Sequence, residues 1–252
     1  MEQALAYKKR NYIHERASYE PKGPQEEFIV PLLKQAIADA VRNEAPAGGP
    51  SAGRRVLDIG CGKQPFRGLF EGQGYEYFGL DVQTHENTRI DFIAPIDQDL
   101  PAELLSQGAY DFILCTEVLE HVANWHAAFG NFSRLLKNGG RILITCPHFY
   151  QLHEEPYDFW RPTNHAIEIF ARNYGLQVVR IQKAGTAWDV LGTLLANSTF
   201  YINSTKLTHR LFFRFFQLML KKLSVSLKRR EIQEIVAVHG PLYLSNVAVL
   251  EK

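Results

Sequence analysis

The chain has 252 residues, of which 46% are hydrophobic and 22% are charged. These proportions exclude a wholly disordered chain, and the length allows one large domain with a substantial buried core. The 28 Lys and Arg residues nearly balance the 27 Asp and Glu residues. A formal net charge of +1 supplies no overall field that would favour nucleic acid, so we expect no nucleic-acid partner.

The cysteines and the hydropathy pattern indicate a compartment. Cys61, Cys115 and Cys146 lie far apart and form no Cys-x-x-Cys pair. This excludes a disulfide framework and a cysteine-rich zinc site, and it is typical of a reducing environment. The N-terminal segment lacks the apolar stretch of a secretory signal, and no run of about 18 apolar residues predicts a transmembrane helix. We therefore expect a cytoplasmic protein without a transmembrane segment.

The N-terminal part of the chain differs in pattern from the rest. Residues 1–24 are polar and predict an arm, whereas residues 25–43 carry apolar side chains at helical spacing. A segment rich in Gly and Pro, 45–53, predicts a boundary. We expect residues 1–50 to form an N-terminal arm and helix, and residues 51–252 to form one domain.

Strand and helix patterns alternate after that boundary. Strands are predicted at 55–59, 75–81, 89–93, 110–115, 141–146, 177–181 and 244–250. Helices are predicted at 119–136, where Asn138-Gly139-Gly140 would end the helix, at 164–174, and in an insertion at roughly 186–231. This alternation predicts an α/β fold: a doubly wound, mostly parallel, Rossmann-like seven-stranded sheet, with an N-terminal helical extension and a helical insertion before the last strand.

The first predicted strand leads into a glycine loop, Asp58-Ile-Gly60-Cys-Gly62, at the edge where open α/β sheets bind ligands. Asp81 ends the second strand, where a carboxylate can accept two hydrogen bonds from a ribose diol. Pro65 stands where a dinucleotide-binding loop has its third glycine. Asp58 would also repel phosphates, whereas the ammonium and sulfonium groups of S-adenosylmethionine would be attracted to it. The loop therefore favours S-adenosylmethionine over a dinucleotide.

Five blocks together resemble the class I S-adenosylmethionine-dependent methyltransferases. The blocks are VLDIGCG (56–62), YFGLD (77–81), DQDLP (97–101), YDFILCTEVLEHV (110–122) and LLKNGGRILIT (135–145). The resemblance covers about 52–185, and the last predicted strand is similar to the family's last strand. It implies S-adenosylmethionine as cofactor and a methyltransferase activity, without indicating the acceptor.

The resemblance also implies roles for the residues of the glycine loop and the second strand. Gly60 and Gly62 would pass beneath the methionine part of the cofactor, and Asp58 would hold the loop or the ammonium group. Asp81 would bind the ribose hydroxyls. The alternative is a Rossmann-like domain that has lost ligand binding.

The residue that contacts the adenine amino group is expected just after the third strand. Asp97 and Asp99 both lie there, and Ala94-Pro95-Ile96 departs from the family's usual pattern. The sequence leaves the choice between these two carboxylates open.

A Glu-x-x-Glu-His block follows the fourth strand. If a helix starts by Glu117, then Glu117, Glu120 and His121 share one face. They could bind a divalent cation, with His148 or His153 as a further ligand. The block looks like that of metal-assisted O-methyltransferases, including the ubiquinone-pathway and small-RNA 2′-O enzymes, in which the metal would lower the pKa of the acceptor oxygen. The structural alternative, which we favour, is that the acidic residues stabilise a helix N-terminus and His121 caps or packs.

The segment 146–163 leaves the same sheet edge with histidines, carboxylates and several aromatic side chains. Such a mixture suits a small-molecule acceptor site. His148 and His153 are the candidate catalytic bases because imidazole titrates near neutrality. The spacing of Asp158 and Arg161 predicts a pair that anchors the loop. The segment is similar to one in methyltransferases of natural-product and surface-glycan pathways.

The insertion contains a predicted amphipathic helix over 207–230. One narrow polar stripe interrupts its Leu, Phe and Met residues; it consists of Arg210, Arg214, Gln217, Lys221, Ser224 and Lys228. Such a helix could lie on an anionic membrane, but we favour docking on the protein itself or across a homodimer. Its position before the last strand predicts a lid over the acceptor.

These observations favour an enzyme that moves a methyl group from S-adenosylmethionine to an oxygen, or with less support a nitrogen, of a small metabolite from a natural-product, quinone or glycan pathway. An RNA or protein methyltransferase is the alternative enzyme. The absence of a basic binding module argues against RNA. A catalytically silent adaptor that uses the same fold is the alternative from another class.

Overall fold

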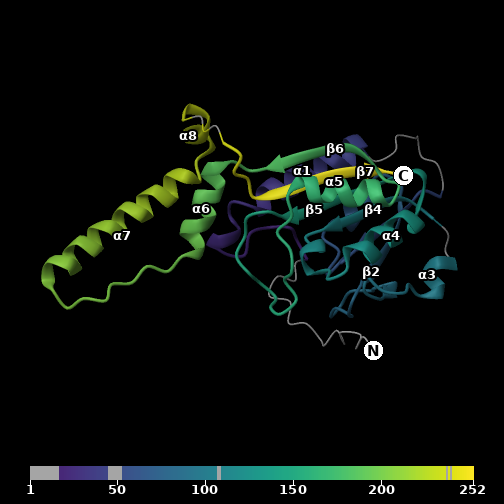
Figure 1. Ribbon diagram of the computed structural model, residues 1–252, viewed down its shortest axis with the longest axis horizontal. Coiled ribbons are helices and arrows are strands. Elements are labelled where there is room, and N and C mark those ends of the chain that lie inside the picture. The colour runs from purple at the N-terminus through teal and green to yellow at the C-terminus, as the bar shows by residue number, and fades with distance from the viewer. Residues whose placement is uncertain (1–16, 45–52, 107–108, 237, 239) are drawn as a thin grey trace.

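Seven strands form one mixed sheet at the centre of the computed structural model, in the order β3-β2-β1-β4-β5-β7-β6 (Figure 1). The strands are β1 Arg55–Ile59, β2 Glu76–Asp81, β3 Phe92–Ile93, β4 Tyr110–Thr116, β5 Leu136–Pro147, β6 Gln177–Ala184 and β7 Ser245–Glu251. The structure describes residues 17–44, 53–106, 109–236, 238 and 240–252. The predicted doubly wound α/β fold with a seven-stranded sheet is confirmed.

The pairing of the strands places the carboxyl ends of every strand except β7 at one edge. Strand β1 runs parallel to β2 and β4, and β4 runs parallel to β5. Strand β7 is antiparallel to both β5 and β6, so β6 has the same direction as β5. The loops that follow β1, β2, β4, β5 and β6 therefore all leave from one side of the sheet, where open α/β folds bind ligands.

The helices cover both faces of this sheet. They are α1 Val30–Glu44, α2 Arg67–Glu71, α3 Ala102–Ser106, α4 Trp125–Leu135, α5 Asn164–Asn173, α6 Ala187–Asn197, α7 Leu207–Leu227 and α8 Arg230–Ile235, with short 3₁₀ helices η1 Pro24–Glu26 and η2 Leu119–His121. Helix α1 packs on β5 and β7, and α4 and α5 pack on strands of the same sheet. The predicted division at residue 50 lies outside the described residues.

The apolar runs of the strands are buried because both faces are covered. In β4, Ile113 belongs to one hydrophobic core while Phe112 and Leu114 belong to the other. Successive side chains point to opposite faces of a strand, so a continuous run of apolar residues fills both cores. This is why the strands appear in the sequence as short uninterrupted apolar segments.

The helix predicted over 119–136 begins later than expected. The 3₁₀ helix η2 is followed by a break, and α4 starts after Asn124, whose side-chain oxygen accepts a hydrogen bond from the N–H of Ala127 at 3.2 Å. An N-cap of this kind satisfies a backbone donor that the first helical turn leaves unpaired. Strand β5 then begins directly at Leu136, and Gly139 has φ +75° within the turn that was predicted to end the helix.

The insertion at 186–231 is helical, as predicted, and consists mainly of α6 and α7. Helix α7 packs against α6 but projects away from the sheet (Figure 1). Within the described part of the chain, no helix combines the length and the apolar character that crossing a membrane requires.

Helix α6 approaches the N-terminal segment at a glycine, which gives a test of the packing. A Cβ atom at Gly192 would collide with the ring of the buried Phe28. Although alanine favours a helix by about 1 kcal/mol over glycine, we expect Gly192→Ala to destabilise the protein by about 1–3 kcal/mol through overpacking. Gly68→Ala in α2 is the matched control, because no atom lies within 4 Å of its Cβ position. Urea unfolding of both variants measures the difference, and equal stabilities would contradict the packing.

Candidate functional site

A cavity of about 200 Å³ opens at the carboxyl ends of β1, β2 and β4. The residues that line it include the predicted Asp58, Gly60, Gly62, Asp81 and Asp97, and, on the other side, Glu117, His121 and His153. The strand ends thus bring the glycine loop and the Glu-x-x-Glu-His block into one site. The predicted cofactor half and the predicted acceptor half face the same space.

The two glycines of the loop serve different purposes. Both have positive φ values, +67° at Gly60 and +50° at Gly62, which L residues with side chains rarely adopt. A Cβ at Gly60 would collide with Val118, so this glycine allows the loop to pack against the end of β4. No atom lies within 4 Å of a Cβ at Gly62, which lines the cavity. Gly62 therefore leaves room for a ligand beside the backbone.

Asp58 lies beneath this loop with only 2% of its surface exposed. Burial is the main cause that raises the pKa of its carboxyl to about 7; the nearby Asp81 acts in the same direction, and a hydrogen bond from the Tyr77 hydroxyl opposes it. A cationic ligand group in the cavity would favour the ionised carboxylate.

Asp81 connects the ends of two strands. Its Oδ2 accepts a hydrogen bond from the N–H of Gly62 at 2.9 Å, and its Oδ1 accepts one from the N–H of Val82 at 2.7 Å. Nε2 of His85 lies 3.2 Å from Oδ2, and both side chains are buried. The N–H of Gln83 also approaches Oδ1, at 3.4 Å, so these contacts fix the carboxylate at the cavity wall.

The structure separates the two carboxylates between which the sequence could not choose. Asp97 is buried, lines the cavity and accepts a hydrogen bond from the N–H of Asn124 at 3.2 Å. Asp99 is exposed and does not line the cavity. Of the pair, only Asp97 is placed to meet a ligand.

The expectation that Glu117, Glu120 and His121 share one helical face is wrong. Glu117 has φ +53° and precedes the 3₁₀ helix, so the chain turns sharply between the first glutamate and the other two residues. The carboxylate of Glu117 accepts hydrogen bonds from Thr145 Oγ1 at 2.9 Å and from Ser245 Oγ at 3.4 Å. Glu117 is therefore bound to β5 and β7 rather than aligned with Glu120.

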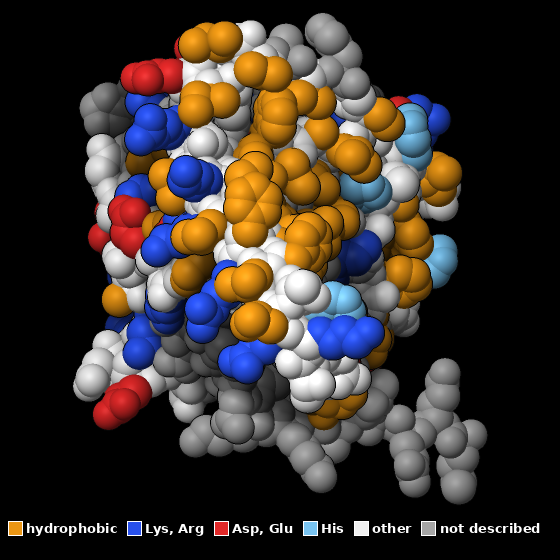
Figure 2. Space-filling view, turned by 90° about the vertical axis from the view of Figure 1, so that its left-hand side faces the viewer, with side chains coloured by type: hydrophobic (Ala, Val, Ile, Leu, Met, Phe, Trp, Pro, Cys, Tyr) orange, Lys and Arg blue, Asp and Glu red, His pale blue; other side chains and the backbone are white. Residues whose placement is uncertain are grey.

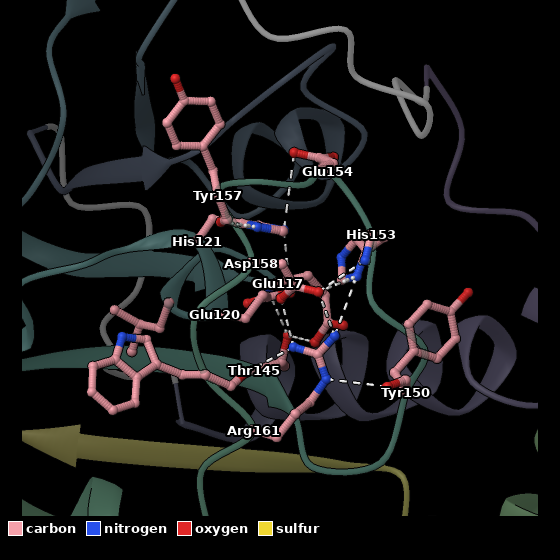
Figure 3. A network of polar contacts seen from close by, with 12 residues as sticks. Glu117, Glu120, His121, Thr145, Tyr150, His153, Glu154, Tyr157, Asp158 and Arg161 are labelled. Atoms are coloured by element: carbon pink, nitrogen blue, oxygen red, sulfur yellow. Dashed lines mark hydrogen bonds and ion pairs between the residues drawn. The ribbon is translucent and has the colours of Figure 1, made fainter. Parts of the chain in front are cut away.

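Glu120 instead meets two histidines (Figure 3). Ligand atoms of Glu120, His121 and His153 lie within 4.8 Å of one another. Glu120 is fully buried, and neither carboxylate oxygen has a hydrogen-bond partner among the described residues. Burial, with the charge of Glu117, raises the pKa of this carboxyl well above its ordinary value.

His121 is oriented for a ligand on its Nε2 side. Its Nδ1 lies 2.8 Å from the carbonyl oxygen of Tyr157, to which an Nδ1–H donates, and its Nε2 faces the Glu120 carboxylate at 3.8 Å. Glu154 approaches the same nitrogen, with Oε2 at 4.0 Å. A backbone carbonyl on one imidazole nitrogen is the usual arrangement that fixes the tautomer of a metal-binding histidine.

His153 is held by the predicted pair of Asp158 and Arg161. Arg161 donates to both carboxylate oxygens of Asp158, at 2.6 and 2.7 Å. Oδ2 of Asp158 also accepts a hydrogen bond from the backbone N–H of His153 at 2.9 Å. Although burial opposes it, these hydrogen bonds hold the pKa of Asp158 below its ordinary value. The pair anchors the loop, as the spacing predicted, and thereby positions His153 at the cavity.

His148 lies elsewhere. Its ring stacks on Tyr243 with centroids 4.2 Å apart, and its Nδ1 is 3.0 Å from the carbonyl oxygen of Pro162. His148 does not line the cavity, whereas His153 does. His148 and His153, both predicted from the sequence as candidate bases, therefore have different surroundings.

The N-terminal segment forms a wall that the sequence did not predict. Tyr19, Glu26 and Val30 line the cavity, as does His85 on the opposite side. No described residue of the insertion lines it, so the predicted lid over this cavity is not observed. For His85, the spacing of four residues after Asp81 is a local sequence feature that could have predicted its contact with Asp81. The sequence contains no comparable feature for Tyr19, Glu26 and Val30.

Comparisons with known proteins identify the family of the chain. A family model described as "Methyltransferase domain" matches residues 30–180. The chain belongs to this methyltransferase domain family. The resemblance stated from the sequence blocks is thereby confirmed, and the match also includes α1.

Two relatives of the methyltransferase domain are named as ubiquinone biosynthesis O-methyltransferases. The one from Xanthomonas oryzae is 30% identical over 105 residues, 37% of this chain and 43% of that protein. The mitochondrial one from Rattus norvegicus is 27% identical over 163 residues, 60% of this chain and 46% of that protein. The chain thus spans less than half the length of these relatives.

Solved structures show the same fold for this methyltransferase domain. Phosphoethanolamine N-methyltransferase 2 from Haemonchus contortus, in complex with S-adenosylmethionine, has a TM-score of 0.51 at 18% identity, over 87% of this chain and 52% of that chain. The [4+2]-cyclase SpnF has a TM-score of 0.52 at 14% identity, over 93% and 96% of the two chains. Since one of these is named as a cyclase, the fold alone does not determine the reaction.

The raised pKa of Asp58 predicts a pH dependence of stability. The unfolded carboxyl ionises near its ordinary pKa of 3.8 and the native one near 7, so the native state binds the proton more tightly between these values. Asp58 then costs nothing below pH 3.8, and its cost rises to about 4 kcal/mol above pH 7, at about 1.4 kcal/mol per pKa unit. We expect Asp58→Asn to match wild type near pH 4 and to exceed it in free energy of unfolding at pH 8. Parallel urea titrations that show a constant difference would contradict this.

Proposed function

We propose that the protein transfers a methyl group from S-adenosylmethionine to an oxygen of a small metabolite. The observation that carries the proposal is the single cavity that joins the Gly60–Gly62 loop, Asp58 and Asp81 to the polar residues of the acceptor side. The names of the O-methyltransferase relatives support an oxygen acceptor of the quinone type.

The residues present fit this cofactor. The space beside Gly62 admits a methionine chain along the backbone, and the buried Asp58 offers a negative charge to its ammonium group. Asp81 would accept the ribose hydroxyls, and Asp97 would accept the adenine amino group. When bound, S-adenosylmethionine supplies an electrophilic methyl group on a sulfonium.

The acceptor side would orient the oxygen and remove its proton. His153 lines the cavity and is fixed by Asp158 and Arg161, so we assign it the role of base. During methyl transfer, His153 would accept the proton that the acceptor oxygen loses. His148, which stacks outside the cavity, is no longer our candidate for this role.

Three carboxylates give a matched test of the cofactor half. Asp81→Asn and Asp97→Asn should each weaken S-adenosylmethionine binding by about tenfold or more, since a hydrogen bond to a charged group contributes about 1.5–3 kcal/mol. Asp99→Asn should bind like wild type, because Asp99 is exposed outside the cavity. Calorimetric titration with S-adenosylmethionine measures all three.

Two outcomes of the same titration would contradict the proposal. A folded wild-type protein that binds no S-adenosylmethionine would favour the silent adaptor. Binding together with salt-sensitive retention of RNA and methylation of RNA would favour the alternative enzyme. An unchanged affinity in Asp81→Asn would remove the ribose assignment alone.

As an alternative to the role of His153 as base, we propose that His153 holds a divalent cation together with Glu120 and His121. The supporting observation is the buried Glu120 carboxylate, whose oxygens have no hydrogen-bond partner among the described residues and face two imidazoles. A buried carboxylate without a partner is costly, and a cation would compensate it. Two imidazoles and a carboxylate suit a first-row transition ion better than Mg²⁺. A bound cation would lower the pKa of an acceptor hydroxyl.

Two glutamates provide the test of this cation site. We expect Glu120→Gln to lose Mn²⁺ binding by calorimetry and to lose most activity, because it removes the carboxylate of the cluster. Glu117→Gln should keep Mn²⁺ binding, since Glu117 is hydrogen-bonded to Thr145 and Ser245 instead. Full activity of the wild type in a chelator, or no Mn²⁺ binding, would show that Glu120 is structural.

The remaining expectations on compartment and assembly stay proposals. The three cysteines are free and buried, and burial raises their pKa values, which supports a reducing compartment such as the cytoplasm. A small-molecule acceptor is the proposed partner. A homodimer stays a prediction.

A further inference from the structure

Helix α7 exposes a broad apolar surface that the methyltransferase site does not use. Six of its hydrophobic side chains are each more than half exposed: Leu207, Leu211, Phe212, Phe215, Leu218 and Met219. They occupy adjacent positions on one side of the helix, at the spacing of helical turns. Contiguous apolar surface of this kind marks an interaction site more often than single exposed residues do.

The opposite side of α7 provides its attachment to the protein. Phe216 packs edge-on against Phe200, with ring centroids 5.7 Å apart, and Leu227 is buried at the C-terminal end. Lys228 forms an ion pair with Glu27 just beyond the helix. The docking that the sequence favoured therefore accounts for one side and one end of α7. It does not account for the outward apolar face.

The insertion also concentrates positive charge. No Asp or Glu occurs between Asp189 and Glu231, whereas eight of the chain's 28 Lys and Arg residues do. The rest of the chain therefore has 20 basic residues against 27 acidic ones. The net charge near zero is therefore the sum of a positively charged insertion and a negatively charged remainder of the chain.

Part of this charge borders the apolar face. Arg210, Arg214 and Lys221 are exposed along one flank of α7, and Lys222 lies among the apolar positions. Figure 2 shows hydrophobic side chains gathered in the middle of this face, with Lys and Arg beside them and acidic side chains at the margin. The surface thus combines an apolar centre with a cationic border.

We propose that α7 binds the surface of a membrane that contains anionic lipids. An apolar face with a Lys- and Arg-rich flank is the pattern of helices that lie in the membrane interface, where the apolar side chains enter the acyl boundary and the cations meet the headgroups. The helix does not meet the requirements for a membrane span. A second copy of the chain fits less well, because two such faces would bring two basic flanks together.

The position of the insertion in the fold predicts how the protein would be oriented on the membrane. The chain enters it from Ala184, at the carboxyl end of β6, which runs in the same direction as β5. The cavity opens at the carboxyl ends of neighbouring strands in the same sheet. If α7 binds a membrane, the edge of the sheet at which the cavity opens would therefore face that membrane. The inference concerns binding alone and does not depend on methyl transfer.

Co-sedimentation of the full chain with vesicles tests the proposal. We expect binding to phosphatidylcholine vesicles that contain about 30% phosphatidylglycerol, at least tenfold stronger than to pure phosphatidylcholine, and weaker binding at high salt. Arg210→Glu with Arg214→Glu should reduce binding to the anionic vesicles at least tenfold. Phe212→Ser with Phe215→Ser should reduce it similarly, because the apolar contact is lost.

A matched control separates the helix from net charge. Arg42→Glu with Arg172→Glu makes the same change in net charge at exposed positions outside the insertion, on α1 and α5. This variant should bind vesicles like wild type. Equal losses in both charge variants would show a general electrostatic effect and overturn the assignment to α7.

Light scattering on the same samples tests the competing occupant. A stable dimer that separates in the Phe212→Ser and Phe215→Ser variant, without vesicle binding by the wild type, would assign the face to a second copy. Equal binding to neutral and anionic vesicles would overturn the role of the cations. The altered residues are exposed, and circular dichroism confirms that each variant is folded before it is scored.

Discussion

The carboxylate of Asp81 holds together the two strand ends on which the cavity is built. It accepts hydrogen bonds from Gly62, in the loop after β1, and from Val82, at the end of β2. The glycine loop can therefore approach a ligand closely and still keep a fixed position. The N–H groups of Gly60 and Cys61 also donate to the carbonyl oxygen of Leu80, at 2.8 and 3.3 Å. Asp81 thus adds a side-chain link to a loop that is already paired with β2.

The same arrangement places two carboxyl groups under one ligand. Asp58 is buried beside Asp81, and burial raises its pKa to about 7, so the protein by itself stabilises the charge of this carboxylate poorly. A ligand that brings a positive charge would relieve both the desolvation of Asp58 and the repulsion from Asp81. A pyrophosphate would add to the repulsion. The electrostatics of the cavity thus favour a cationic ligand independently of any sequence comparison.

In the acceptor half, the carboxylate of Glu120 is buried near Arg161, but the guanidinium of Arg161 is already hydrogen-bonded to other groups. Arg161 gives its hydrogen bonds to Asp158 and to backbone carbonyls and lies 3.4 Å from Nδ1 of His153, and it does not donate to Glu120. Glu120 is left fully buried against two imidazoles. Either a proton or a cation must compensate it. This is why Glu120, rather than the more accessible Glu117, decides between a structural and a metal-binding interpretation.

The sequence predicted those features that are local and failed for those that depend on distant packing. The strands and the Asp58–Gly62 loop follow from apolar runs and from spacing along a few residues. The left-handed turn at Glu117 has no such signal, because a non-glycine residue rarely adopts φ +53°, and a Glu-x-x-Glu-His spacing equally suits a helix. Likewise, only the folded loop shows that His153 faces the cavity while His148 stacks on Tyr243.

The outward face of α7 is a second feature that could not be predicted from local sequence patterns. Composition alone gave a net charge of +1 and suggested no charged partner, yet the charges are divided between a basic insertion and an acidic body. The strand order brings the residues of the cofactor half together, whereas loops supply those of the acceptor half. A helix that keeps six large apolar side chains in contact with water carries a cost unless something covers them. Because the insertion that carries this helix begins at the edge that bears the cavity, a membrane that covers the helix would lie on that side of the sheet.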